Sequence, residues 1–156
     1  MKNYIFLFFT FITFSLFGQN GIHNPVDWNF SIEHVQDDIY DLVIVAEIDS
    51  GWSVYSQHVD PDGPIPTSFS FFESDGFKLI DEVKESEAKT KYDPIFQMEL
   101  SSFQQQAVFK QRVQILNETL LTPTMNILDN TLYYSISGEL EFMVCNSEMC
   151  LPPDYV

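Results

Sequence analysis

Two cysteines lie close together near the C-terminal end of the chain, and their type and spacing make them the residues best suited to chemistry. They bound the segment Cys145-Asn146-Ser147-Glu148-Met149-Cys150, which is followed at once by Leu151-Pro152-Pro153. The sequence contains 2 cysteines in all. Two neighbouring cysteines outside the cytosol form either a structural disulfide or a redox-active pair.

The pair is poorly placed for a disulfide whose role is to stabilise the fold. A disulfide that closes a loop of about six residues stabilises a fold by roughly 2 kcal/mol in the chain-entropy model, against about 4.7 kcal/mol for a loop of about 100 residues. Small local disulfides do occur, however. The spacing alone therefore leaves both the structural and the redox role open.

The spacing also argues against a metal site and against the thioredoxin motif. His23, His34 and His58 are scattered far upstream of the cysteines, whereas zinc sites combine a pair such as C-x2-C with a second nearby pair. The arrangement C-x4-C likewise differs from the thioredoxin-type C-x-x-C. We therefore expect no metal. We also expect no cofactor, because a redox-active cysteine pair works by thiol exchange, which needs none.

A redox-active pair at this position would react slowly in free solution. The apolar run before Cys145 is typical of a strand, so no helix N-terminus lowers the pKa of the thiol. The neighbouring Glu148 and Asp154 would raise it, because negative charge opposes ionisation of the thiol. Such a thiol would need activation inside a complex with a chosen partner.

Residues 1–18 have the layout of a secretory signal peptide. Lys2 provides a positive charge, and the stretch from Tyr4 to Phe17 is almost wholly apolar. This run of about 14 residues is shorter than the roughly 20 that a transmembrane helix needs. We expect cleavage near Gly18 to Asn20 and an exported, periplasmic protein, with an uncleaved N-terminal anchor as the alternative.

The remaining chain, residues 19–156, is long enough for one domain with its own core. The sequence has 23 acidic residues against 7 Lys and Arg, and a formal net charge of −16. Nucleic acid and anionic membrane surfaces are poor partners for such a chain, because they are bound through clustered Lys and Arg. On the plainer interpretation, the acidity keeps the protein soluble. On the other interpretation, it steers a basic protein partner toward the domain.

The hydrophobic pattern is that of β-strands. Trp28, Phe30 and Ile32 alternate with polar residues, residues 40–48 are rich in β-branched residues, and Gln111 breaks the inner face of a later strand. No segment keeps an apolar period typical of helices. Short alternating runs separated by turn residues predict an all-β fold, an antiparallel β-sandwich. The candidate strands cover residues 28–32, 40–48, 68–72, 77–80, 96–103, 107–116 and 132–144.

The segments between these strands differ in character. Residues 60–66 are rich in proline and predict a rigid loop. Residues 81–91 are charged and predict a solvated hairpin or a short helical turn. The segment Tyr92-Asp93-Pro94-Ile95-Phe96 places apolar side chains in a loop, where they usually plug the edge of a core and less often cover a site.

Several of these segments occur in a recognisable order. They are Gly51–His58 (GWSVYSQH), Gly63–Thr67 (GPIPT), Tyr92–Phe96 (YDPIF) and Phe142–Pro153 (FMVCNSEMCLPP). Together they resemble the N-terminal periplasmic domain of the thiol:disulfide interchange protein DsbD, a protein-disulfide reductase. The resemblance runs from about Trp28 to the C-terminus, and the block with the cysteines and Pro-Pro is its most specific part.

This resemblance implies an immunoglobulin-like β-sandwich with the two cysteines on adjacent strands. It implies that Cys150 forms the mixed disulfide with a partner and that Cys145 resolves it. Electrons would pass from a thioredoxin-like donor domain to periplasmic thioredoxin-fold acceptors, which include disulfide isomerases and cytochrome c maturation factors. We expect the domain to act as a monomer.

The resemblance also implies a cap loop over the cysteine pair. Ile95 and Phe96 match the capping positions, and Asp93 matches an acidic residue near the thiols. Tyr55 lies in the segment that supplies a tyrosine near the site. Phe96 as an ordinary core residue is the alternative.

Some features depart from the family pattern. The cysteines are closer in sequence than in the best-known members, and Pro94 stands at the second acidic position of the cap loop, so tuning of the thiols by two carboxylates is in doubt. One further strand would be expected after Val156. The alternatives to a redox carrier are a non-enzymatic sandwich that binds a protein or glycan and has a structural disulfide, and an inactive remnant.

Overall fold

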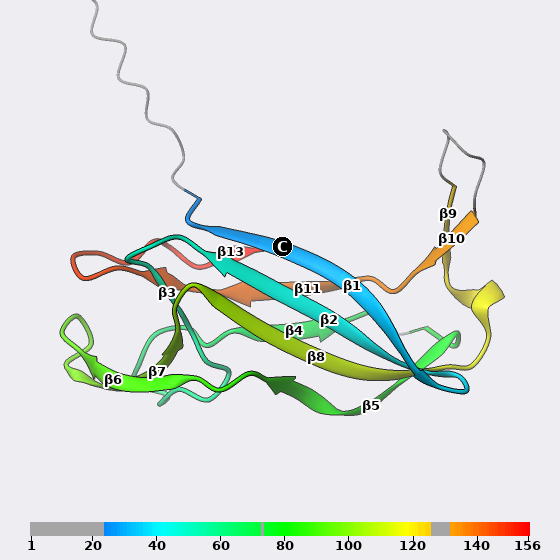
Figure 1. Cartoon of the computed structure of the whole chain (residues 1–156), viewed down its shortest axis with the longest axis horizontal. Helices are drawn as coiled ribbons and strands as arrows, with labels where there is room; N and C mark the ends of the chain where they lie inside the picture. The colour runs from blue at the N-terminus through cyan, green and yellow to red at the C-terminus, as the bar shows by residue number, and fades with distance from the viewer. Residues whose placement is uncertain (1–23, 73, 126–131) are drawn as a thin grey trace, which may run out of the picture.

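Strands make up almost all of the regular structure in residues 24–72, 74–125 and 132–156, the part of the chain that the computed structural model describes (Figure 1). Within these ranges the helical structure is a short 3-10 turn, η1 (Glu118–Leu120), and no helix is long and apolar enough to cross a membrane. The predicted signal peptide lies outside the described residues. In chain order the strands are β1 (Val26–Gln36), β2 (Ile39–Ile48), β3 (Ser53–Tyr55), β4 (Ser68–Phe71), β5 (Phe77–Glu85), β6 (Lys89–Asp93), β7 (Met98–Phe103), β8 (Gln106–Ile115), β9 (Thr122–Met125), β10 (Leu132–Ser135), β11 (Gly138–Phe142), β12 (Val144–Cys145) and β13 (Asp154–Tyr155).

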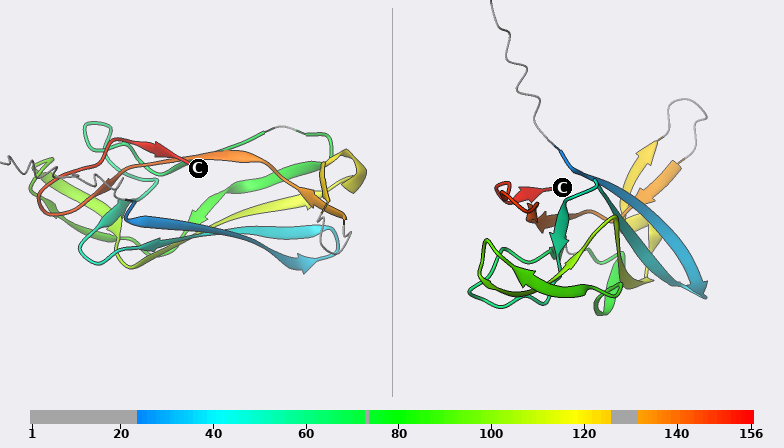
Figure 2. Two further views of the ribbon diagram at one scale, coloured as in Figure 1. Left: turned by 90° about the horizontal axis from the view of Figure 1, so that it is seen from above. Right: turned by 60° about the vertical axis from the view of Figure 1, so that its left-hand side comes forward.

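The strands pack as two layers. One layer is the long antiparallel sheet β1-β2-β8-β5, and the other consists of two shorter sheets, β12-β3-β7-β6 and β13-β11-β4. Figure 2 shows the layers from above and from one end, with the hairpin β9–β10 projecting from the far end of the molecule. The predicted all-β class is confirmed, and the packed antiparallel sheets are consistent with an immunoglobulin-like sandwich.

Aromatic rings from both layers form the centre of the main core. Phe109 of β8 is fully buried, and its ring centroid lies 5.1 Å from that of Phe69, 5.5 Å from that of Phe103 and 6.1 Å from that of Trp28. Trp28 in turn packs edge-on against Phe142. This cluster joins β1 and β8 of the long sheet to β4, β7 and β11 of the opposite layer, with Trp28 partly buried against it.

Two buried polar side chains of the long sheet, Gln111 and Asp41, are hydrogen bonded, whereas the buried indole N–H of Trp28 has no hydrogen-bond partner among the described residues. Gln111 points into the sandwich, where its side-chain amide donates hydrogen bonds to the carbonyl oxygens of Arg112, at 2.7 Å, and Ile80, at 3.1 Å. On the outer face, the Arg112 guanidinium donates two hydrogen bonds to Asp41, at 2.8 and 3.0 Å, and these lower the pKa of that carboxyl. The predicted break at Gln111 is real, but its hydrogen bonds compensate for the burial.

The candidate strand at residues 132–144 is wrong as a single element. The chain there forms β10, β11 and β12, which pair with β9, with β4 and β13, and with β3, respectively. At the start of β11, a Cβ on Gly138 would lie 2.6 Å from the carbonyl oxygen of Ser70, so this close approach to β4 requires glycine. The alternation of apolar residues continues through the whole segment. It gives no sign that the segment pairs with different strands along its length.

Two further predictions are corrected. Phe30 and Ile32 are 57% and 56% exposed, because β1 is an edge strand and Phe30 lines an open apolar groove rather than the closed core. Residues 81–91 form neither a hairpin nor a helical turn. They contain the end of β5, which pairs with β8, and the start of β6, which pairs with β7, so the chain crosses here between layers.

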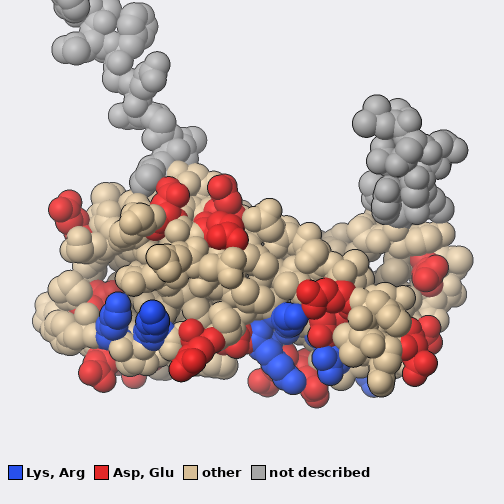
Figure 3. All heavy atoms as spheres, viewed as in Figure 1, with Lys and Arg blue, Asp and Glu red and all other residues tan. Residues whose placement is uncertain are grey.

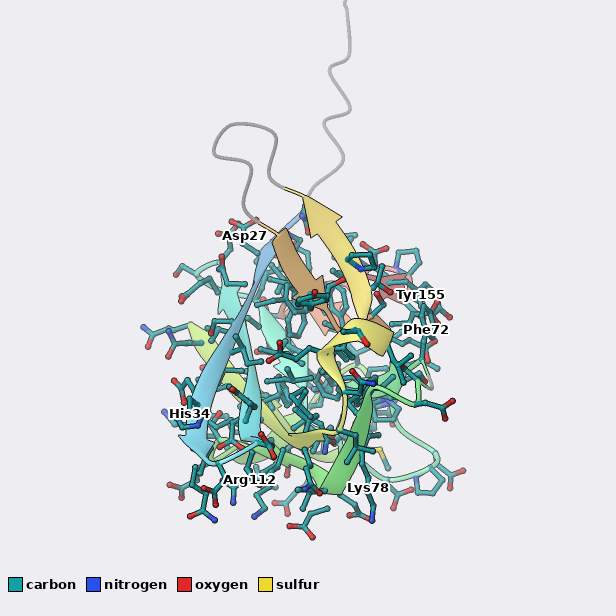
Figure 4. The ribbon with its side chains drawn as sticks, turned by 90° about the vertical axis from the view of Figure 1, so that its right-hand side faces the viewer. Asp27, His34, Phe72, Lys78, Arg112 and Tyr155 are labelled. Atoms are coloured by element: carbon teal, nitrogen blue, oxygen red, sulfur yellow. A yellow bond between two sulfur atoms is a disulfide. The ribbon has the colours of Figure 1, made fainter. Side chains whose placement is uncertain are left out.

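Replacement of Phe109 by alanine tests the central position of this ring. We expect Phe109→Ala to lower the free energy of unfolding by about 3–5 kcal/mol, because it leaves a cavity between the layers. Phe72→Ala is the matched control, since Phe72 is 59% exposed and its ring lies at the surface (Figure 4), and it should change stability by less than about 1 kcal/mol. Urea denaturation measures both, and equal losses would contradict the described core.

Candidate functional site

The two cysteines face each other across a short hairpin. Cys145 ends β12, and Cys150 returns opposite to it in an isolated antiparallel bridge with a Cα–Cα distance of 4.0 Å and a disulfide between the two sulfurs. The flanking residues are hydrogen bonded, Leu151 N–H to Val144 O at 3.0 Å and Asn146 N–H to Met149 O at 2.9 Å. The cysteines therefore occupy a non-hydrogen-bonded pair, where opposite residues come closest.

The turn between the cysteines is held by a side chain. The Oδ1 atom of Asn146 accepts hydrogen bonds from the backbone N–H groups of Glu148, at 2.8 Å, and Met149, at 2.9 Å. This is an Asx turn, in which a side-chain oxygen takes the place of a backbone carbonyl. It fixes the geometry that brings Cys150 back to Cys145.

Cys145 lies on the outer face of its sheet, away from the main core. Val144 pairs with Val54 and belongs to the main core, whereas Cys145 pairs with Ser53 and points the other way. Tyr55, two residues along β3, shares the outer face. There Cys145, Tyr55 and Leu100 are 2%, 1% and 3% exposed and form a separate small cluster.

The loop between β3 and β4 covers part of this cluster. Thr67 at its end donates its hydroxyl to the Tyr55 carbonyl oxygen at 2.6 Å. In its middle, a Cβ on Gly63 would lie 3.2 Å from Leu100 Cδ2, so the proline-rich segment rests directly on β7. At its start, the Glu85 carboxylate accepts hydrogen bonds from the Ser56 hydroxyl and the Gln57 N–H.

The β6–β7 hairpin bounds the cluster on another side. Its turn, residues 94–97, lies in the segment that was predicted to act as a cap, and it is called the cap turn. The Asp93 Oδ1 atom accepts hydrogen bonds from the N–H groups of Ile95, at 2.9 Å, and Phe96, at 3.2 Å. The ring of Phe96 packs edge-on to Tyr55, with centroids 6.0 Å apart, and joins the cluster around both cysteines. Ile95 is 39% exposed.

One hydrogen bond connects the cap turn to the buried cluster. The Tyr55 hydroxyl donates to Asp93 Oδ2 at 2.7 Å. Burial, together with this bond and the negative charge of Asp93, raises the pKa of Tyr55 well above its ordinary value, so the phenol stays protonated. Asp93 therefore holds the turn with one carboxylate oxygen and the tyrosine with the other.

A small polar cavity of about 200 Å³ lies between the cysteine turn and the β6–β7 hairpin. Its lining includes Cys145, Asn146, Ser53, Tyr55, Asp93 and Lys91. In the described part of the chain, no group of three or more His, Cys, Asp or Glu side chains could hold a metal ion. The chemical groups that this site offers include the disulfide, the Tyr55 phenol, the Asp93 carboxylate and the Lys91 ammonium group.

The structure brings together most of the residues singled out in the sequence. Cys145, Cys150, Tyr55 and Phe96 share one cluster, and Asp93 is hydrogen bonded to it through Tyr55. The exposed Ile95 is not a member of this cluster. The strand predicted from residue 96 begins at Met98, which leaves Phe96 in the turn.

Sequence reasoning missed the specific contributions of Asn146 and Glu85. The signal for Asn146 was present, because asparagine at the start of a short segment between two strand ends favours an Asx turn. Nothing in the charged segment around Glu85 distinguishes it from its neighbours, because its partners Ser56 and Gln57 are far away in the sequence.

The basic residues lie on other elements than the cysteine segment, and one of them, Lys91, lines the cavity beside Cys145. Lys2 lies outside the described residues, and the other Lys and Arg residues all lie on β5, β6 and β8. In Figure 3 they follow the lower side of the molecule, where Figure 1 shows these strands. Residues 138–156 contain acidic residues and no Lys or Arg. Negative charge beside the cysteines opposes formation of a thiolate.

Comparison with known proteins gives one match. A family model described as "Thiol:disulfide interchange protein DsbD, N-terminal" matches residues 23–156, a range that includes every described residue. No curated protein and no solved structure matches the chain.

Removal of the Tyr55 hydroxyl tests the connection between the cluster and the cap turn. In Tyr55→Phe the second oxygen of Asp93 loses its donor, so we expect the Ile95 and Phe96 amides to exchange their hydrogens severalfold faster than in the wild type. Tyr92→Phe is the control, because Tyr92 is 63% exposed on the same hairpin. Hydrogen exchange measured by NMR reports both, and unchanged exchange in Tyr55→Phe would show that this bond does not hold the turn.

Proposed function

The chain belongs to the family of DsbD N-terminal domains, and on that premise we propose that it is a thiol-disulfide exchange domain of the protein-disulfide reductase type. In this proposal the Cys145–Cys150 pair takes electrons from a thioredoxin-like donor and passes them to thioredoxin-fold acceptors. The predicted signal peptide and the family support a periplasmic location. Disulfide isomerases and cytochrome c maturation proteins are the candidate acceptors.

The observation that carries the proposal is the difference in burial between the two cysteines. Cys145 is 2% exposed and sits on β12, between Tyr55 and the cysteine turn. Cys150 is only partly buried and lies on the returning leg of the hairpin. A partner thiol therefore has better access to Cys150, which supports Cys150 as the residue that forms the mixed disulfide and Cys145 as the one that resolves it.

The exchange with an acceptor then takes two steps. The Cys150 thiolate attacks a sulfur of the acceptor disulfide, which forms a mixed disulfide and releases the second acceptor sulfur as a thiolate. The Cys145 thiolate next attacks the Cys150 sulfur, which closes the intramolecular disulfide and releases the first acceptor sulfur. The acceptor gains two electrons and two protons, and the donor restores the domain by the reverse sequence.

The surroundings support a pair that reacts in complexes rather than in free solution. The helical structure of the described chain is the turn η1, which is not among the elements around the cysteines, so a helix dipole does not lower the thiol pKa. Nearby acidic side chains oppose ionisation. A partner that contributes its own positive charge or helix N-terminus would supply the missing stabilisation of the thiolate.

In the proposal, the cap turn protects the cysteine pair from reaction in free solution. Phe96 packs in the cluster that includes both cysteines, and Asp93 fixes the turn through two backbone amides and Tyr55. In the proposal Phe96 shields the disulfide, and the exposed Ile95 is the part of the cap that an arriving partner meets first. Displacement of the turn then opens the way to Cys150.

Trapping of the mixed disulfide tests the proposed roles. Cys145→Ser protein is mixed with a thioredoxin-fold protein that retains one active-site cysteine, activated as a mixed disulfide with a small thiol. We expect the Cys150 thiolate to displace the small thiol and form a covalent complex that persists, because both resolving thiols are absent. Cys150→Ser is the matched control and should give on the order of tenfold less complex, because its remaining thiol is buried. Non-reducing gels and mass spectrometry identify the linked residues.

The opposite result is equally clear. If Cys145→Ser captures no thioredoxin-fold protein and the reduced wild type also fails to reduce one, the pair is a structural disulfide. Preferential capture through Cys145 would reverse the proposed roles of the two cysteines.

A further inference from the structure

The two turns beside the disulfide are built in the same way, but with different side chains. In the cap turn, Asp93 Oδ1 accepts hydrogen bonds from the amides two and three residues further on. In the cysteine turn, Asn146 Oδ1 does the same with Glu148 and Met149. The motif thus uses a carboxylate in the cap and an uncharged amide next to Cys145.

We propose that Asn146 is a positioning residue for the thiol pair. It holds the hairpin in the conformation that opposes Cys150 to Cys145, and it does so without adding a negative charge beside the thiols. This inference deepens the proposed exchange function and rests on it. It assigns to Asn146 two separable effects, one on the disulfide equilibrium and one on thiol reactivity.

The first effect follows from how the segment around Cys150 is held. On the side of Cys150, the backbone bonds across the hairpin are those at Asn146–Met149 and Val144–Leu151. Pro152 and Pro153 follow directly and have no N–H groups with which to extend the ladder. Pairing resumes beyond them, where β13 pairs with β11 and Val156 exchanges two backbone hydrogen bonds with Leu140. Once the disulfide is reduced, Cys150 therefore lies between this anchored C-terminal end and the turn, and the Asn146 side chain restrains the turn.

This restraint is coupled to the redox equilibrium. The oxidised state requires the hairpin conformation, because the disulfide joins opposed residues, whereas the reduced state can leave it. A contact that stabilises the hairpin therefore favours the oxidised pair over the reduced pair. Loss of the contact should make the disulfide easier to reduce.

The second effect follows from charge. A carboxylate is a stronger acceptor for backbone amides than a neutral amide oxygen, so aspartate would also hold this turn. Its charge, however, would lie in the residue next to Cys145 and would raise the thiol pKa values. Asparagine therefore provides the restraint without adding a charge to a site that already contains Glu148 in the same turn, and Lys91, Asp93 and Tyr55 in the lining of the cavity beside Cys145.

Equilibration with reduced and oxidised glutathione tests the first effect. In this exchange the domain dithiol and oxidised glutathione give the domain disulfide and two molecules of reduced glutathione. We expect Asn146→Ala to lower the equilibrium constant about tenfold, which makes the reduction potential about 30 mV less negative. Asn146→Asp should restore the constant to within about threefold of the wild type, because the acceptor is kept.

The rate of thiol alkylation as a function of pH tests the second effect. The midpoint for Asn146→Asp should move to higher pH and its rate at neutral pH should fall, because the carboxylate opposes thiolate formation. Ser147→Ala is the matched control, since Ser147 is an exposed residue of the same turn, and it should leave both quantities unchanged.

Four results would overturn the inference. The first is an unchanged glutathione equilibrium in Asn146→Ala, and the second is an equal shift of that equilibrium in Ser147→Ala. The other two concern Asn146→Asp, which would have the same equilibrium constant as Asn146→Ala or the same pH profile as the wild type. No partner protein enters these measurements, so a failure of the exchange function with thioredoxin-fold proteins is distinguishable from a failure of this inference.

Discussion

The pairing of β12 with β3 is the interaction on which the site depends. Because side chains alternate along a strand, the register that buries Val144 against Val54 in the main core also turns Cys145 and Ser53 to the outer face. A shift of one residue would place Cys145 inside the sandwich and Val144 outside. The stability of the main core thus fixes the position of the buried cysteine, and the disulfide itself contributes little to holding the layers together.

The rest of the site is added to that outer face by polar contacts rather than by a second large core. Thr67 ties the covering loop to the Tyr55 carbonyl, and Asp93 ties the cap turn to the Tyr55 hydroxyl. Tyr55 is therefore the meeting point of the loop, the cap and the cysteine cluster. This small apolar cluster buries less apolar surface than the main core, so local opening there costs less free energy than unfolding of the sandwich.

Much of this arrangement could be predicted from the sequence, and the exceptions share a physical cause. Alternation correctly located β2 and β8, and the YDPIF motif correctly located a loop, the turn between β6 and β7, because these signals are local. The division of residues 132–144 among three sheets and the partners of Glu85 depend on contacts between distant segments, which periodicity does not report. The exposure of Phe30 and Ile32 likewise depends on β1 lying at an open edge of the sandwich.

The central claim is that Cys145 and Cys150 form an exchanging pair, and the reduction potential of the wild-type pair tests it most directly. Structural disulfides of exported proteins typically lie below about −300 mV, whereas disulfides that exchange have less negative potentials. Redox equilibration against a thioredoxin-fold protein of known potential gives the value. The account predicts a potential above about −300 mV, and a value well below it would identify the disulfide as structural and contradict the account.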